Sequence, residues 1–349
     1  MKTCDIAVNR LPVLTWNRLR MNNAVVSGVT LPQQGSFRAA GAARPAAEPL
    51  PDAFRDIPTG CGAELTALLA DGGVQPAVLR AEGLTRLTFA FDADASAGHQ
   101  LCLSVGADRS AVVLMDFTGP ADAVGQGIVQ TLIDLAPRAR LHLVQVQRVG
   151  SGYTFFNDIG ARCGAEAELT VTQLILSGAR SYAGCEADLR GDGSRFDASA
   201  AYALAGSETL DLNDVVRHRG RRTLSNIEVN GSLRGRSAKL FRGTIDFIRG
   251  SAGAVGGERE SVLLIDDGCI NRTIPLILCE EEDVEGNHGA SIGRPDEEVL
   301  FYLSSRGIPE EEAFALLIRA KLDAAAGRIP DPDFRQEMLD FIKGGAANG

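Results

Sequence analysis

The sequence predicts a mainly β protein, a parallel β-helix followed by a short α-helical region. Strand-like runs separated by Gly or Asp-Gly recur from residue 140 to 292, often near two dozen residues apart or half of that. A sandwich of about seven strands would end well short of this length, whereas a solenoid continues because each coil stacks only on its neighbours. Aromatic residues make up 5% of the chain and 39 residues are glycine, which favours tight corners around a small aliphatic interior.

The N-terminal region, residues 1–75, is predicted to be irregular and partly helical. Residues 11–21 are expected to form a short helix or an extended segment anchored around Trp16. The Ala/Pro/Gly-rich run 33–51 has no period and predicts a loop or linker. Residues 64–70 have the pattern of a short amphipathic helix.

The core, residues 76–292, is predicted to be the β-helix. Runs of strand-forming residues alternate with turn residues throughout it, and Gly256-Gly257 predicts one of the turns. One helix, 128–136, is expected to interrupt the strands, where Pro137 closes the run IVQTLIDLA. The predicted strands are 77–80, 87–91, 100–105, 111–116, 140–147, 167–176, 182–189, 195–204, 208–217, 223–230, 238–248, 261–265 and 275–278.

The C-terminal region, residues 293–349, is predicted to hold three helices. Asp296 and the glutamates after it place acids in the first turn of the first helix, and Gly307 is its expected C′ residue. Pro309 is expected at position N1 of the second helix, and Asp331-Pro332 caps the third. The predicted apolar face of the second helix consists of Ala313, Leu316, Leu317 and Ala320.

Charge and composition exclude several classes of protein. The net charge of −10 and a pI near 5.0 argue against a nucleic-acid binder, because phosphate affinity needs clustered Lys and Arg. The chain has no apolar run of about 18 residues, so no membrane span is predicted. Its first residues lack the apolar core of a signal peptide, which predicts a cytoplasmic protein with reduced thiols. The seven cysteines have neither disulfide-framework nor zinc-ribbon spacing.

The stretch that joins the core to the helices holds the main ligand candidates. Cys269 offers a soft thiolate that suits Fe–S, Cu(I) or Zn sites, and the glycine-flanked His288 offers an imidazole that suits iron or zinc. Cys279 and Glu282 are weaker candidates, the second in a run of hard carboxylate ligands. The alternatives are a cysteine packed in the β core, a histidine in a turn and an acidic edge exposed to solvent.

Other polar residues carry weaker predictions. His218 lies in the arginine-rich run 217–222, which is either an anion site or a surface of ion pairs and contacts. His99 and His142 lie in strand-like runs and are expected to be structural. The sequence has no P-loop, no dinucleotide-binding motif and no nucleophile paired with a base, so no catalytic centre is predicted.

Several ordered motifs resemble the SufB/SufD family of iron–sulfur cluster assembly proteins. The resemblance covers residues 206–319, and weakly 11–21. The matching motifs are Asp214–His218 with Thr223–Ser225, Lys239–Ile245, Asn287–Gly293 and, most specific, Asp296–Ile308.

This resemblance implies a right-handed parallel β-helix that serves as a non-enzymatic scaffold for cluster assembly. The implied partners are the ABC-type ATPase SufC, docked on the C-terminal helices, and a SufB-like paralogue or a second copy at the end of the β-helix. No tightly bound cofactor is implied, only a transient iron–sulfur cluster. The residues expected to face the ATPase are Leu300, Phe301, Tyr302, Arg306, Glu312, Leu316 and Leu317.

The chain departs from both branches of the family. Cys269 stands in the C-x-x-x-T-x-P pattern of SufB-like members, whereas His288 stands where SufD-like members carry their histidine. Gly286-Asn287 replaces the Cys-Ser pair of SufD, and Gly289 replaces the glutamate of SufB. Much of the family's N-terminal region is also missing from this sequence. A SufD-like subunit is the preferred interpretation, with a self-pairing scaffold, a β-helix enzyme acting on glycans and a purely structural solenoid as alternatives.

Overall fold

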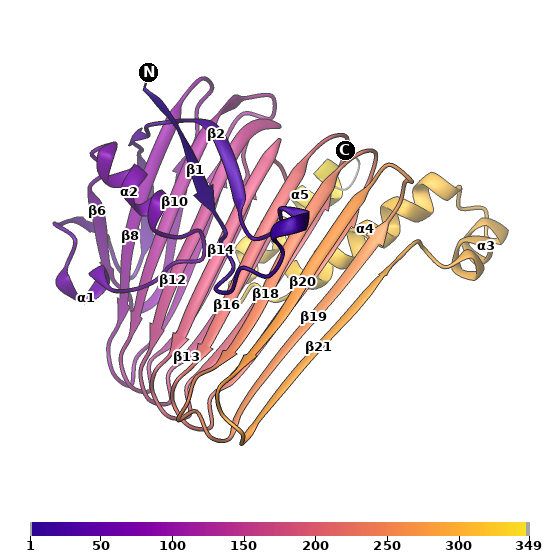
Figure 1. Cartoon of the computed structure of the whole chain (residues 1–349). Coiled ribbons are helices and arrows are strands. Elements are labelled where there is room, and N and C mark those ends of the chain that lie inside the picture. Colours follow the sequence, from indigo (N-terminus) through magenta and orange to yellow (C-terminus); the bar gives the residue numbers. More distant parts are fainter. Residues whose placement is uncertain (1, 347–349) are drawn as a thin grey trace.

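The computed structural model describes residues 2–346 and confirms the parallel β-helix (Figure 1). It is a β-solenoid of about seven turns with helices near the C-terminus. The last three residues of the predicted C-terminal region lie outside the described range.

Two long sheets form the walls of the solenoid, one of 10 strands, named sheet 1, and one of 9 strands, named sheet 2. Sheet 1 contains β3 (Gln33–Gln34), β5 (Ala46–Ala47), β6 (Pro76–Arg80), β8 (Ser96–Val105), β10 (Val124–Leu135), β12 (Gly152–Cys163), β14 (Arg180–Leu189), β16 (Thr209–His218), β18 (Ala238–Phe247) and β20 (Ile270–Cys279). Sheet 2 contains β4 (Phe37–Gly41), β7 (Gly83–Ala90), β9 (Ser110–Thr118), β11 (Arg140–Arg148), β13 (Glu168–Ile175), β15 (Arg195–Leu204), β17 (Leu224–Leu233), β19 (Ala254–Leu264) and β21 (Val284–Gly293).

Each coil uses one strand from each sheet, and neighbouring strands of β6–β21 within a sheet pair in parallel. The paired residues are separated by 26 residues between Thr154 and Arg180 and by 32 between Ala238 and Ile270. The predicted repeat of two dozen residues is therefore too short, because every coil also contains two corner turns.

One corner of the solenoid, where sheet 1 leads into sheet 2, repeats a single turn geometry. We name it the charged corner. The backbone has a positive φ of 54° to 75° at one residue of each of six successive turns, which are Asp108, Arg138, Glu166, Gly193, Arg222 and Gly253. Such a left-handed conformation costs a non-glycine residue on the order of 1 kcal/mol, so the regular stacking of the coils outweighs a local preference.

The interior is a largely apolar column built from alternate residues of most strands, with buried charged side chains near its C-terminal end. Its members include Phe89, Phe117, Phe155 and Phe241, all buried. Burying one such side chain stabilises the fold by about 1.5–3 kcal/mol. Short aliphatic side chains and alanines fill most of the remaining column, as the aromatic-poor composition predicts.

The predicted helix 128–136 is wrong, because this segment belongs to β10. The strand pairs on both sides, with β8 and β12. Val129 and Ile133 face the interior, while Ile128 and Leu132 pack under N-terminal segments on the outer face. A strand buried on both faces has a continuous apolar run and cannot be distinguished from a helix by its period.

The N-terminal region covers the outer face of sheet 1 (Figure 1). Its other elements are β1 (Thr3–Val8), η1 (Asn17–Leu19), β2 (Ala24–Thr30), α1 (Asp52–Arg55) and α2 (Ala63–Asp71). Helix α2 confirms the helix predicted at 64–70. The predicted loop 33–51 instead contains β3, β4 and β5, and β4 and β5 pair antiparallel with the first strands of the solenoid. These antiparallel strands cap the N-terminal end of the coil stack.

The segment 11–21 is anchored at its ends rather than at Trp16, which is exposed. Leu11 and Met21 pack against Ile274 of β20. The Nε of the buried Arg242 donates to the Met21 carbonyl at 2.7 Å, and its Nη1 donates to the Asp211 carboxylate at 2.5 Å.

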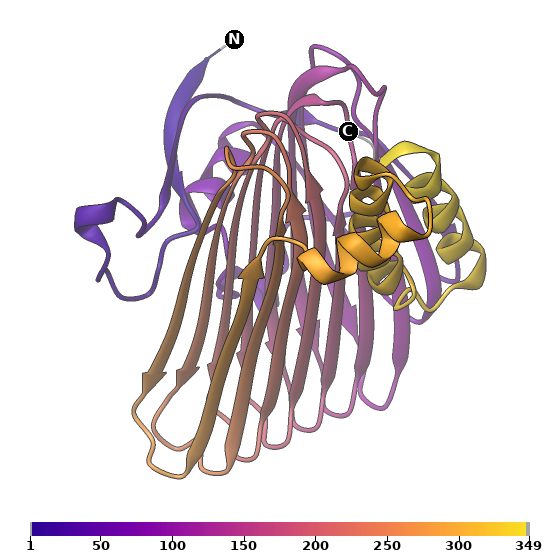
Figure 2. The same cartoon turned by 90° about the vertical axis from the view of Figure 1, so that its right-hand side faces the viewer.

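The three C-terminal helices are α3 (Glu297–Ser305), α4 (Glu310–Ala326) and α5 (Pro332–Phe341), followed by η2 (Ile342–Ala346). Helix α4 runs back over sheet 2 and contacts β13, β15 and β17 (Figure 2). Its buried residues are Ala313, Ile318, Leu322, Ala325 and Ala326. The predicted apolar face is therefore wrong except at Ala313, and Pro309 is the N-cap rather than N1. Gly307 follows α3 with a φ of +83°, and Asp331 caps α5 through the Phe334 amide, as predicted.

Candidate functional site at the open end of the solenoid

The last coil of the solenoid ends both sheets with unpaired edges. Within residues 2–346, β20 is hydrogen-bonded only to β18, and β21 only to β19. Most residues of β21 are exposed, and Ile270, Ile277 and Ile292 present exposed aliphatic side chains there. We name this surface the open end. An unpaired strand edge beside exposed apolar side chains is a typical template for another chain.

Cys269 lies in the turn before β20, at the corner opposite the charged corner. Its side chain is half buried and packs partly against the interior column. The Sγ atom is 3.8 Å from the Gly235 carbonyl oxygen. Arg294, just after β21, forms an ion pair with Asp267 in the same turn, so the start of β20 and the end of β21 meet here.

His288 lies in the middle of β21 and is exposed. It pairs in register with Glu258 of β19, so the two side chains lie on the same face of sheet 2. A Cβ added at Gly286, two residues before His288, would lie 3.0 Å from a ring atom of Phe247, whereas Gly289 beside His288 has open space around it. His288 is thus a strand residue rather than the turn residue considered as an alternative.

The structure does not bring the predicted ligands together within one chain. His288 precedes Arg294 by six residues, which corresponds to about 20 Å along a strand, whereas Cys269 lies at the Arg294 corner. Cys279 ends β20 at the charged corner, where its Sγ donates to the Glu281 carbonyl at 3.0 Å. Glu282 is in the turn beyond it. Within residues 2–346, no three His, Cys, Asp or Glu side chains are grouped to hold a metal.

Behind the open end, the interior column contains charges that the sequence analysis missed. Lys239 of β18 forms a fully buried ion pair with Glu260 of β19. Thr273 of β20 donates to the other oxygen of Glu260 at 2.6 Å. Glu258 and Asp214 are buried nearby. The alternation of buried and exposed residues could have identified them, because Glu258 and Glu260 lie four and two residues before the buried Val262 and therefore on the same face of the strand. The glycines before Glu258 instead led to the prediction of a turn.

Helix α3 projects away from the solenoid and has no buried residue (Figures 1 and 2). Phe301 is 77% exposed and Tyr302 is 56% exposed, with the Arg306 guanidinium 5.2 Å from the Tyr302 ring centre. Leu316 of α4 is exposed, Leu317 is half buried, and Glu312 is exposed. Five of the seven residues predicted to face an ATPase are therefore exposed, whereas Leu300 on α3 and Leu317 on α4 are half buried.

The arginine-rich run 217–222 is largely a network of ion pairs. Arg217 contacts Glu186 and Asp246 at 2.6 and 2.8 Å, and Arg219 contacts Asp188 at 2.9 Å. His218 is buried, stacks on Phe247, and has Thr223 and Ser225 hydroxyls as hydrogen-bond partners. Burial lowers the pKa of His218 to about 4. These contacts favour the ion-pair alternative over an anion site.

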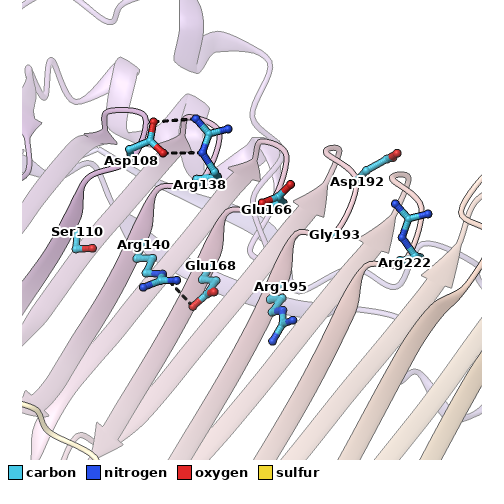
Figure 3. A pocket seen from close by; sticks show the side chains of 10 residues that line it. All are labelled: Asp108, Ser110, Arg138, Arg140, Glu166, Glu168, Asp192, Gly193, Arg195 and Arg222. Carbon is cyan, nitrogen blue, oxygen red and sulfur yellow. Dashed lines mark hydrogen bonds and ion pairs between the residues drawn. The ribbon is translucent and has the colours of Figure 1, made fainter.

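A groove of about 700 Å³ follows the charged corner (Figure 3). Its stacked side chains alternate in sign, with ion pairs between Asp108 and Arg138 and between Arg140 and Glu168. Four carboxylates and four guanidinium groups line it. Because these charges balance, the groove has no net preference for an anion or a cation, and we do not assign it a ligand.

Comparisons with known proteins identify similar chains. A family model described as the SUF system FeS cluster assembly, SufBD core domain, matches residues 89–321. The iron–sulfur cluster assembly protein SufD of Bacillus subtilis is 25% identical over 287 residues, covering 80% of this chain and 65% of that protein. SufB of the same organism is 31% identical over 157 residues, covering 44% of this chain and 33% of that protein. The chain therefore spans less than two thirds of the length of these relatives.

Proposed function

Since the chain belongs to the SufBD family of iron–sulfur cluster assembly proteins, we propose that it is a non-catalytic scaffold subunit that works with the ABC-type ATPase SufC in the cytoplasm. The observation that carries this proposal is the open end of the solenoid, which combines two unpaired strand edges with the candidate ligands Cys269 and His288. A transient cluster would be its cargo rather than a resident cofactor.

The ligands in this proposal come from two chains. Within one chain, His288 lies about 20 Å along β21 from the corner that holds Cys269, too far for the two side chains to bind one iron atom together. Pairing of two open ends, with a SufB-like paralogue or a second copy, would place ligands of one subunit opposite those of the other. The exposed Ile270, Ile277 and Ile292 would be buried in that contact.

Pairing is tested at Ile292 of the last coil, whose in-register neighbour on β19 is the buried Val262. Ile292→Lys should convert a paired species into a single chain, because a lysine would be buried at an apolar contact. The measurement is mass by light scattering after size exclusion, for the chain alone and with a SufB-like partner. Val124→Ser removes an exposed aliphatic side chain far from the open end and serves as the control. An unchanged mass for Ile292→Lys would contradict pairing through this surface.

Ligand function is tested by anaerobic reconstitution of the purified complex with iron and sulfide. Cys269→Ser and His288→Ala should each reduce cluster absorbance, and the double variant should reduce it most. Cys4→Ser is the matched control, because it removes another partly buried thiol, in the N-terminal hairpin. Undiminished cluster formation in the double variant would contradict the ligand assignment.

ATPase docking requires point variants rather than deletion of the helices. Removing α4 and α5 would expose their apolar contact with Leu114, Val144 and Leu174 of sheet 2, so lost binding would be ambiguous. Phe301→Ala and Leu316→Glu alter only exposed side chains. Each should lower the affinity for SufC at least tenfold, measured by titration calorimetry. Equal affinity in both variants would exclude this surface.

A further inference from the structure

A loop with exposed apolar side chains projects from the outer face of sheet 1 (Figure 2). It consists of residues 12–20, all of which are exposed, and we name it the N-terminal loop. Its large apolar side chains are Val13, Leu14, Trp16 and Leu19, and Leu19 is 56% exposed. Apolar side chains gathered on one exposed loop are typical of a surface that another molecule covers.

The base of the N-terminal loop is fixed to the last strands of sheet 1. Asp211 of β16 forms an ion pair with the buried Arg242 of β18. Before the loop, Nδ2 of Asn9 donates to the Asp211 carboxylate at 2.7 Å, and after it, the Met21 carbonyl accepts from Arg242. Met21 also packs against Ile274 of β20. Because β20 is the last strand of sheet 1, the loop stands beside the open end.

The tip of the N-terminal loop is held in one conformation by its own hydrogen bonds. The Trp16 amide donates to Oδ1 of Asn22 at 2.8 Å, and Nδ2 of Asn22 donates to Oδ1 of Asn17 at 2.5 Å. A groove of about 930 Å³ lies between Leu14 and helix α2, so this flank of the tip is open. A preorganised loop loses little conformational entropy when it binds a partner.

The strand edges of the open end form only a small contact surface by themselves. Strands β20 and β21 have 10 residues each, which makes them about 33 Å long, and packed sheets lie about 10 Å apart. The outline of the end face is thus roughly 330 Å², whereas each partner in a specific interface buries about 800 Å². A stable pair therefore needs further surface beside these edges, and the N-terminal loop offers it.

The charges of the N-terminal loop and of the open end are opposite. Arg10, Arg18 and Arg20 are exposed, and the sequence has no carboxylate between residues 10 and 21. The turn that joins β20 to β21 contains four consecutive acidic residues, 280–283. Two patches of opposite charge on one chain are self-complementary under two-fold symmetry, because every contact between them occurs twice.

We propose that the N-terminal loop docks on the last coil of a second copy of this chain. The loop would reach across the joint between two open ends, where its apolar tip is buried and its arginines are attracted by the acidic turn of the other copy. This inference rests on the pairing of open ends in the proposed function, and it adds the loop as a second part of that interface.

The fluorescence of Trp16 provides a direct test, because it is the only tryptophan in the sequence. The purified full-length chain is diluted in steps, and its mass by light scattering is compared with its emission spectrum. We expect the emission maximum to move to shorter wavelength as the mass doubles, because pairing removes water from Trp16. An emission maximum that stays constant while the mass doubles would overturn the inference, as would a chain that stays single at every concentration.

Variants of the N-terminal loop test its contribution to affinity. Leu14→Ser combined with Leu19→Ser should weaken pairing at least tenfold, because both copies of the loop lose apolar contacts. Arg18→Glu should weaken pairing more at low salt than at high salt, because salt screens charges that are exposed. Thermal unfolding of the single chain should stay unchanged, since these side chains are exposed. Leu84→Ser removes an exposed leucine from β7, near the other end of the stack, and should not change the affinity.

The outcomes separate this inference from the proposed function. Loop variants that pair like the wild type, while Ile292→Lys remains single, would refute the inference alone. Pairing that depends on the loop, in a complex that forms no cluster, would refute the proposed scaffold function alone. The chain is also mixed with vesicles of phosphatidylglycerol. A shift of the Trp16 emission on these vesicles, in a chain that remains single, would assign the loop to a membrane surface and overturn the inference.

Discussion

Replacement of Lys239 by methionine should destabilise the solenoid by about 3–5 kcal/mol, because it leaves Glu260 as an uncompensated buried charge. Both side chains are fully buried, and their ion pair bridges sheet 1 and sheet 2. Thr273 still donates to Glu260 at 2.6 Å in the variant, which places the expected loss at the lower end of that range. Such a loss is a large part of the stability of an ordinary domain.

A double-variant cycle separates the charge from the packing. Lys239→Met combined with Glu260→Gln removes both charges and keeps similar volumes, so most of the stability should return. The assay is thermal unfolding followed by circular dichroism, in which the melting temperature of the single variant should fall by about 4 °C. Equal losses in the single and double variants would refute the reasoning, because they would assign the cost to lost packing rather than to an unpaired carboxylate.

The remaining predictions concern helix α5 and a buried histidine. Arg148→Ala should loosen α5, because Arg148 joins the buried Asp116 to Glu337 at 2.6 Å each; amide exchange in α5 should rise, and unchanged exchange would contradict this. Asp331→Ala should cost about 1 kcal/mol in urea unfolding, because its carboxylate caps the Phe334 amide at 2.7 Å, whereas an exposed Asp333→Ala should cost less. Burial lowers the pKa of His99 to about 4. Neutral His99 therefore stabilises the fold above a pH of about 6.5, and about 3 kcal/mol of stability is lost as the pH falls towards 4. In His99→Leu, the free energy of unfolding should fall less between about pH 6.5 and 4 than in the wild type. The same fall in both proteins would contradict this prediction.

The fold class was predictable because a solenoid repeats one local pattern. Many of the predicted strands differ from the observed ones by only a few residues at either end; 195–204 matches β15 in both bounds. Strands β10 and β12 were not predicted, because both of their faces are buried and polar and apolar residues therefore do not alternate along them. Strand β21 was not predicted for the opposite reason, since almost all of its residues are exposed.

The site was only partly predictable, because its geometry depends on which coil is last. Sequence motifs identified Cys269 and His288 as candidates but carried no information on their separation along β20 and β21. Glu258 was not recognised as a buried residue, because the glycines before it are typical of turns. In the structure one of them, Gly256, instead packs against Ile245 in the interior column. Its buried position follows only from the register with β17 and β21.

The two ends of the solenoid differ in a way that limits assembly. At the N-terminal end, β4 and β5 run against the direction of the stack and interrupt its parallel register. At the other end, β20 and β21 leave the register free to continue. In a pair joined through these free edges, both outer ends would be N-terminal ends capped by antiparallel strands. Association of this kind is isologous and closes at two subunits, whereas a solenoid with two free ends would grow head to tail into a filament.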